Sequence, residues 1–309
     1  MVVGGAGATV TPMSRPTAPF GSLLTASITP FAEDGSVDYE AFWRLLHHLE
    51  DTGTEGVVVC GTTGESPTLA PEEKLALFAS AVDAVGDRIK IIAGTGTYNT
   101  AESVEMTKEA AVVGCHGVMA VTPYYSKPPQ HGLHAHFTAI ADATDLPVLL
   151  YNIPGRTARL IEVETLAALA DHPNIVAVKD AVDDITYTKR ALEVLPDTFA
   201  VYAGSDFMTK AIMDAGGVGV VSVASHVVGR QIAAMIESVL GGDDERATSI
   251  DDALTPVFEA LFLEPNPMPV KEAVDRFWGR VGAPRLPLVR ASDETMAAVE
   301  AAMTTATAV

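Results

Sequence analysis

The sequence is poor in cysteine and in positive charge. Its two cysteines, Cys60 and Cys115, lie in or beside apolar segments. This usage indicates two buried thiols in a reducing compartment and excludes a disulfide framework, so we expect a cytoplasmic protein. Lysine and arginine together number 20 against 40 acidic residues, which gives a net charge of −20. A surface this acidic argues against nucleic acid and against anionic membranes as partners.

Long apolar runs and several familiar motifs are also missing. No run approaches the ~20 apolar residues that a membrane span needs. Residues 1–20 are rich in Gly, Ala, Thr and Pro, with Arg15 as their only charge, and they lack the pattern of a secretory signal. We expect them to form a disordered extension. The spacing of His131, His134 and His136 does not place all three on one helical face, so no metal site is predicted there.

What the sequence does contain is a regular alternation of strand-like and helix-like segments. The helix-like segments carry apolar residues at spacings of three and four, as in residues 39–50, which follow the N-cap candidate Asp38. Another helix is expected to begin at Pro71. The strand-like segments number eight: residues 23–29, 56–60, 90–93, 117–121, 147–151, 175–179, 199–203 and 219–222.

This order predicts parallel βαβ units that close into a (β/α)8 TIM barrel over residues 21–235. A doubly wound open sheet is the alternative, but the first strand is not followed by the Gly-x-Gly-x-x-Gly turn of dinucleotide-binding folds. Beyond residue ~225 only helix-like segments remain, within residues 229–240, 244–262, 267–278 and 292–304. Residues 236–309 are therefore expected to form a helical C-terminal appendage.

Lys179 is the most informative single residue. It ends the apolar run of residues 175–178, where burial of an ammonium group is costly. A lysine in a low-dielectric site has a lowered pKa and becomes a nucleophile that forms Schiff bases with carbonyl compounds. A structural ion pair between Lys179 and Asp180 would explain this Lys-Asp pair equally well.

The placement of four other polar segments favours the chemical interpretation. Each follows or ends a predicted strand, so all of them would meet Lys179 at the carboxyl-terminal mouth of the barrel, where such barrels carry their active sites. Taken singly, each segment is explained as a turn or as ordinary packing. The segments are Gly-Thr-Thr-Gly-Glu-Ser at residues 61–66, Val-Thr-Pro-Tyr-Tyr at residues 121–125, Tyr-Asn-Ile-Pro-Gly-Arg-Thr at residues 151–157, and Gly-Ser-Asp at residues 204–206.

Together with Val-Lys-Asp-Ala at residues 178–181, the first three of these motifs resemble, in order and spacing, those of the pyruvate-dependent class I aldolases. This superfamily includes N-acetylneuraminate lyase, and the resemblance runs from about Gly21 to the C-terminus. It implies that Lys179 forms an imine with pyruvate and that Tyr151 shuttles protons over it. It further implies that Thr62 links Tyr151 to Tyr125 in a proton relay, with no metal and no organic cofactor.

The resemblance also implies how substrates and subunits are held. Thr63 binds the pyruvate carboxylate, Arg156 binds the carboxylate of the second substrate, and backbone carbonyls of Gly204 and Val221 lie near the lysine. Tyr125 reaches into the neighbouring subunit's site, which implies a homodimer, usually paired into a homotetramer.

Arg156 bears on the choice of reaction. A guanidinium suits bidentate binding of a carboxylate, which L-aspartate 4-semialdehyde carries and a neutral sugar aldehyde does not place there. We therefore expect a lyase that condenses pyruvate with this semialdehyde on the route to diaminopimelate and lysine. The alternatives are an aldolase that cleaves a 2-keto-3-deoxy sugar acid to pyruvate, and a catalytically silent barrel that binds a keto acid.

The sequence departs from lysine-inhibited relatives at their effector site. The histidine and asparagine of that site correspond here to Lys74 and Tyr98, whereas Glu102 matches. A cation at position 74 would repel lysine, so weak or absent feedback by lysine is expected. Residues 263–271 also resemble the superfamily, and we expect them to shape the appendage and the assembly.

Overall fold

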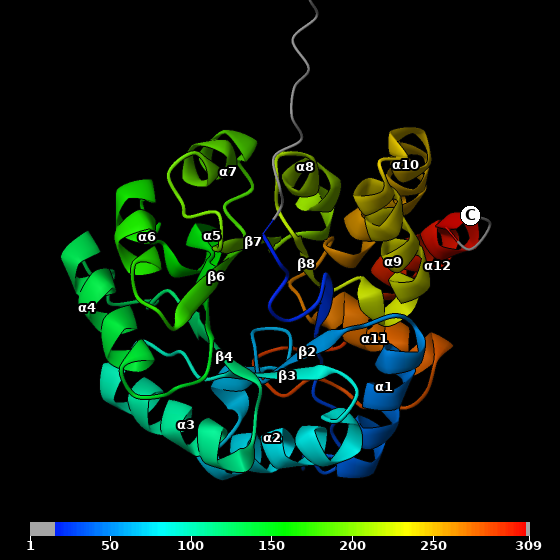
Figure 1. Ribbon diagram of the computed structural model, residues 1–309. Helices are drawn as coiled ribbons and strands as arrows, with labels where there is room; N and C mark the ends of the chain where they lie inside the picture. Colours follow the sequence, from blue (N-terminus) through cyan, green and yellow to red (C-terminus); the bar gives the residue numbers. More distant parts are fainter. Residues whose placement is uncertain (1–15, 307–309) are drawn as a thin grey trace, which may run out of the picture.

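The computed structural model describes residues 16–306, and its centre is a closed barrel of eight parallel strands (Figure 1). The strands follow one another in sequence order, and the last pairs with the first. The predicted TIM barrel is therefore confirmed. The strands are β1 (Leu23–Ala26), β2 (Gly56–Val59), β3 (Lys90–Gly94), β4 (Gly117–Val121), β5 (Val148–Asn152), β6 (Ile175–Asp180), β7 (Ala200–Ala203) and β8 (Gly219–Ser222).

Helices surround the barrel, as Figure 1 shows. Two predicted helix starts are confirmed: the Asp38 carboxylate accepts the Ala41 N–H at 2.8 Å, and α2 begins at Pro71. The helices that follow the strands are α1 (Tyr39–Asp51), α2 (Pro71–Val85), α3 (Thr100–Val113), α4 (Gln130–Ala141), α5 (Pro154–Thr157), α6 (Val163–Ala170), α7 (Ile185–Leu192), α8 (Thr209–Asp214) and α9 (Ser225–Gly241).

The C-terminal appendage lies on one flank of the barrel. The predicted boundary between residues 235 and 236 falls inside α9, so a single helix joins the appendage to the barrel. The next helices, α10 and α12, pack against α9 and against each other, and α11 also contacts α9. Their bounds are α10 (Asp244–Leu261), α11 (Met268–Phe277) and α12 (Asp293–Ala306).

Alternate strand residues fill the barrel interior. The inward set includes Val58, Ile92, Leu149 and Tyr202, all fully buried, while the outward set packs against the helices. Phe20 belongs to the same interior cluster, and its N–H donates to the Tyr202 hydroxyl at 3.3 Å. Of the predicted disordered extension, residues 1–15 lie outside the described residues. Among residues 16–306, no helix combines the length and the hydropathy of a membrane span.

Candidate active site

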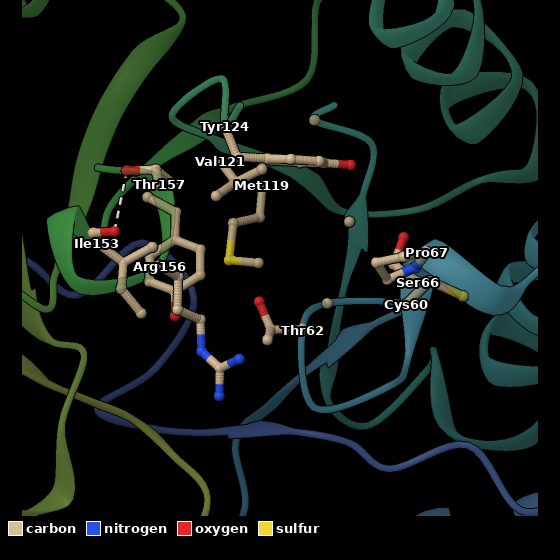
Figure 2. Close-up of a pocket in the computed structure, with 14 residues that line it drawn as sticks. Cys60, Thr62, Ser66, Pro67, Met119, Val121, Tyr124, Ile153, Arg156 and Thr157 are labelled. Atoms are coloured by element: carbon tan, nitrogen blue, oxygen red, sulfur yellow. Dashed lines mark hydrogen bonds between the residues drawn. The ribbon is translucent and has the colours of Figure 1, made fainter. Parts of the chain in front are cut away.

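A cavity of about 210 Å³ opens at the carboxyl ends of the barrel strands. Three predicted site residues line it: Thr62 from the loop after β2, Tyr151 from β5 and Arg156 from α5. In Figure 2 the Thr62 hydroxyl and the Arg156 guanidinium project into the same space. The cavity is also lined by Cys60, Gly61, Ser66, Pro67, Gly94, Gly96, Met119, Val121, Tyr124, Ile153 and Thr157.

Lys179 lies directly beside Tyr151. The two residues are paired in the register of β5 and β6, and the Lys179 Nζ is 4.4 Å from the centroid of the Tyr151 ring. Only 4% of Lys179 is exposed. Burial lowers the pKa of the Lys179 ammonium to about 8, while the nearby charge of Asp206 opposes this shift and that of Arg156 adds to it. At pH 7 roughly a tenth of such an amine is neutral, against well under a thousandth for an ordinary lysine.

Tyr151 is too weak an acid to ionise unaided. Burial raises the pKa of its phenol to about 12, and the charge of Arg156 and a hydrogen bond with Thr62 counteract this only in part. The phenol is therefore present as O–H at neutral pH, where it can donate a proton and must be resupplied through a hydrogen-bonded partner. Thr62 is the partner that the structure provides.

Asp206 is a buried carboxyl group close enough to Lys179 for its charge to act on the ammonium, and it was not among the predicted site residues. Its buried carboxylate accepts the Ser222 hydroxyl at 2.5 Å and the N–H groups of Val223 and Ala224 at 3.0 Å each. Burial raises the pKa of Asp206, and these three hydrogen bonds and the charge of Lys179 counteract this only in part. In its ionised form this carboxylate favours the cationic states of the lysine, including an iminium.

Thr63 and Arg156 are joined by a residue from the appendage. The Asn266 amide donates to the Thr63 hydroxyl oxygen at 2.9 Å, and the Arg156 guanidinium donates to the Asn266 backbone carbonyl at 3.2 Å. Residues 263–271 were expected to shape only the appendage and the assembly, but Asn266 reaches the site itself. The sequence signal was the Pro-Asn-Pro segment, which carried no information about its distant contacts.

Gly204 and Val221 lie at the ends of β7 and β8. A side chain at position 204 would place a Cβ within 2.7 Å of the Ala181 Cβ, so the close packing there requires glycine. Val221 is fully buried in the barrel interior. Both residues are positioned near the strand ends, and the role of their carbonyls at Lys179 stays a prediction.

Tyr125 does not line the cavity of the single chain. Thr63, Lys179, Gly204 and Val221 are not among the lining residues either, and Thr63, Lys179 and Val221 are buried. Tyr125 is 92% exposed and has a positive φ of 67°. Its neighbour Tyr124 lines the cavity instead and packs edge-on against Tyr98, with ring centroids 5.1 Å apart. The role of Tyr125 at a neighbouring subunit stays a prediction.

The histidine cluster is dispersed. His136 is buried, with its Nδ1 at 2.8 Å from the Thr100 hydroxyl, and burial lowers its pKa to about 4. Within residues 16–306, no group of three or more His, Cys, Asp or Glu side chains is arranged to hold a metal ion.

Comparisons with known proteins agree with this geometry. The model of the dihydrodipicolinate synthetase family matches residues 19–306. A 4-hydroxy-tetrahydrodipicolinate synthase from Synechococcus elongatus is 48% identical over 287 residues, which cover 93% of this chain and 96% of that protein.

Solved structures of the same family are also similar to this chain. A dihydrodipicolinate synthase from Bacillus anthracis is 44% identical with a TM-score of 0.90, covering 92% of this chain and 98% of that one. The enzyme from Cyanidioschyzon merolae, solved with lysine bound, is 42% identical with a TM-score of 0.92, covering 95% and 100%. The expected lyase class is confirmed, and the chain belongs to the dihydrodipicolinate synthetase family.

Proposed function

We propose that this protein acts as a 4-hydroxy-tetrahydrodipicolinate synthase, condensing pyruvate with L-aspartate 4-semialdehyde in the diaminopimelate route to lysine, in the cytoplasm. The observation that carries this proposal is the buried amine of Lys179, 4.4 Å from the Tyr151 ring centroid at the cavity. The names of relatives at 46–48% identity support the choice of reaction.

The neutral Lys179 amine attacks the keto carbon of pyruvate. Tyr151, resupplied through Thr62, protonates the hydroxyl that leaves as water, and an iminium results. The iminium withdraws electrons from the adjacent methyl carbon, so loss of a proton there gives an enamine. The enamine carbon attacks the aldehyde of the second substrate, and the amino group of that substrate then displaces Lys179 and closes the ring. No metal or organic cofactor enters these steps, because the iminium itself is the electron sink.

The hydrogen bonds around Thr63 suit carboxylate binding. Its hydroxyl oxygen already accepts a hydrogen bond from Asn266, so its own O–H remains available to donate to the pyruvate carboxylate. The Arg156 guanidinium, which lines the cavity, is placed to bind the carboxylate of the semialdehyde. Two carboxylate sites of this kind fit two acidic substrates better than a neutral sugar aldehyde.

The proton relay is completed by a second copy of the chain. Tyr125 is exposed in one subunit, and we assign it to the Thr62–Tyr151 pair of its neighbour. The functional unit is then a homodimer, with a homotetramer as its paired form.

Arg156→Ala tests the reaction assignment. The kcat/KM for the semialdehyde should fall about a hundredfold or more, because a hydrogen-bonded charge pair is lost, while the pyruvate adduct on Lys179 still forms. Arg156→Lys keeps the charge and loses the planar fork, so it should recover only part of the activity.

A surface control accompanies the pair: Arg190→Ala, on an exposed residue 3.7 Å from Glu164, should behave as the wild type. The sugar-acid aldolase would be favoured if Arg156→Ala turned over the semialdehyde as fast as the wild type does. Cleavage of a 2-keto-3-deoxy sugar acid by the wild-type enzyme would favour it as well.

A further inference from the structure

An ion pair shielded from water connects the appendage to the loop that carries Thr62 and Thr63. The Nζ of Lys271, on α11, lies 2.6 Å from a carboxylate oxygen of Glu65, and neither side chain is exposed. The same ammonium lies 4.0 Å from the centroid of the Phe31 ring. Such a pair is costly to bury and contributes little net stability compared with apolar side chains of the same shape. We therefore expect the ion pair to matter for where it holds the loop and not for the stability of the fold.

The loop needs such a restraint, because both of its ends have unfavourable backbone conformations. Cys60 and Glu65, which bound residues 61–64, each have a φ of 57° although neither is glycine. Left-handed conformations at ordinary residues persist only where surrounding contacts hold them. The second carboxylate oxygen of Glu65 accepts the Arg285 N–H at 2.8 Å, so the appendage holds this residue from two sides.

The same stretch of the appendage contacts the site at its other end. Asn266, five residues before Lys271, donates to Thr63 and accepts from Arg156, as described above. The 61–66 loop is thus held through the carboxylate of Glu65 and through the hydroxyl of Thr63. In the barrel itself, the Thr29 hydroxyl donates to the Gly64 carbonyl at 2.8 Å and supports the middle of the loop.

We propose that the buried Lys271–Glu65 pair positions the 61–66 loop so that Thr63 presents its hydroxyl to pyruvate and Thr62 meets Tyr151. Lys271 and Glu65 are positioning residues that touch neither substrate. This inference rests on the proposed function, and it assigns the C-terminal appendage a part in pyruvate recognition.

The test compares steady-state kinetics of Lys271→Met, Glu65→Gln and the double variant with the wild type. Each single variant should raise the KM for pyruvate by about tenfold or more, because the loop that carries Thr63 loses the ion pair that positions Glu65. Each should also lower kcat, because Thr62 on the same loop is displaced from Tyr151. The double variant buries no charge, so its thermal midpoint should recover toward the wild type. Its KM for pyruvate should stay raised, because the ion pair that positions residue 65 of the loop is still absent.

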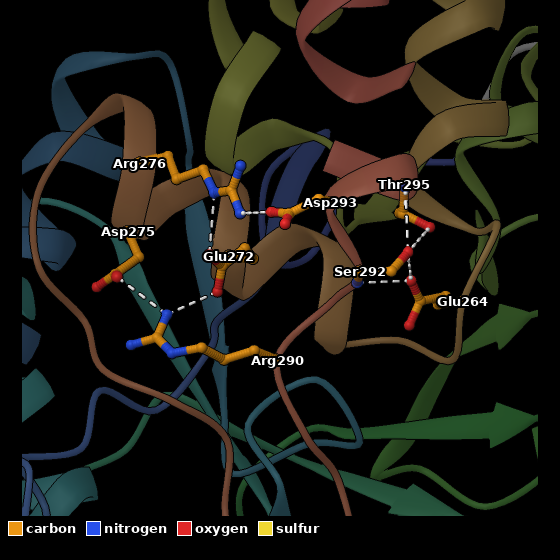
Figure 3. Close-up of polar contacts among 8 residues, drawn as sticks. All are labelled: Glu264, Glu272, Asp275, Arg276, Arg290, Ser292, Asp293 and Thr295. Atoms are coloured by element: carbon orange, nitrogen blue, oxygen red, sulfur yellow. Dashed lines mark hydrogen bonds and ion pairs between the residues drawn. The ribbon is translucent and has the colours of Figure 1, made fainter. Parts of the chain in front are cut away.

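Glu272→Gln is the matched control. Glu272 follows Lys271 on α11 but faces another way: it pairs with Arg276 at 2.9 Å and with Arg290 at 2.6 Å (Figure 3). This substitution breaks ion pairs of the same helix without touching the 61–66 loop. It should lower the thermal midpoint and leave the KM for pyruvate unchanged.

The outcomes separate the inference from the proposed function. The positioning role would be overturned if the double variant had the wild-type KM for pyruvate and lost activity only because less of the enzyme was folded. The synthase assignment would then remain intact. A wild-type enzyme that forms no pyruvate adduct would overturn the function itself. Should Lys271→Met fail to fold, the double variant provides the same comparison.

Discussion

Lys179 and Tyr151 are cross-strand neighbours in β6 and β5, with the lysine Nζ 4.4 Å from the tyrosine ring centroid. The parallel register of the two strands fixes this relationship, so no flexible loop is needed to bring the amine and the phenol together. Both side chains are buried, which lowers the pKa of the lysine and raises that of the phenol. The two shifts have opposite consequences: one increases the fraction of neutral amine, and the other keeps the proton on the phenol.

The rate of imine formation should therefore depend on pH through Lys179. The neutral amine reacts, and its pKa is lowered to about 8, so the rate at limiting pyruvate should rise tenfold per pH unit below 8 and level off above it. Borohydride trapping of pyruvate between pH 6 and 9.5 measures this profile. A rate that still rises tenfold per pH unit between pH 8 and pH 9.5 would show that the pKa of the lysine is not lowered.

Tyr125 should act in the neighbouring subunit's site. Tyr125→Phe alone should lose roughly a hundredfold in kcat, because the outer end of the proton relay is removed. Lys179→Ala should be inactive. Co-expression of the two variants should restore activity, because one of the two sites of a hybrid dimer contains an intact Lys179 and receives Tyr125 from the other chain.

The measurement compares the activity of the co-expressed variants with the activity of each variant alone. If Tyr125 served its own subunit, no hybrid site would be complete and mixing would restore nothing. A double variant carrying both changes in one chain, co-expressed with the wild type, serves as the control for dilution.

Feedback by lysine should be weak or absent. Lys74 is half-buried, with its pKa lowered by burial, and the charge of Glu102 acts on it. The Glu102 carboxylate also accepts a hydrogen bond from Asn99 at 2.7 Å. A second ammonium would meet like charge at Lys74, so millimolar lysine should leave the activity unchanged. Loss of activity at that concentration would contradict this expectation, and Lys74→His tests whether the cation is responsible.

The sequence predicted the architecture and the burial of Lys179 because both depend on local patterns. The alternation of apolar runs and amphipathic segments identified all eight strands, and a lysine at the end of an apolar run led to the proposed nucleophile, which is buried. Strand ends differed by a few residues: β1 ends at Ala26 and not at residue 29, where the Thr29 hydroxyl bonds to Gly64 instead. Such ends are decided by tertiary contacts that periodicity does not contain.

The contacts of the appendage with the site could not be predicted in this way. Asn266 and Thr63 are 203 residues apart in the sequence, and Lys271 and Glu65 are 206 apart. A lysine on a helix is ordinarily a solvated residue, and nothing in its local sequence indicates full burial. The sequence shows Asp206 directly after the seventh predicted strand, but its hydrogen bonds to the end of β8 follow only from the closed barrel.

The central claim is that Lys179 is the nucleophile, and borohydride trapping with pyruvate followed by mass spectrometry of peptides tests it most directly. The measurement is made with and without L-aspartate 4-semialdehyde. We predict a reduced pyruvyl adduct on Lys179 and on no other lysine, together with pyruvate consumption that requires the semialdehyde. An enzyme that consumes both substrates while Lys179 remains unmodified, or an adduct on another lysine, would contradict the account.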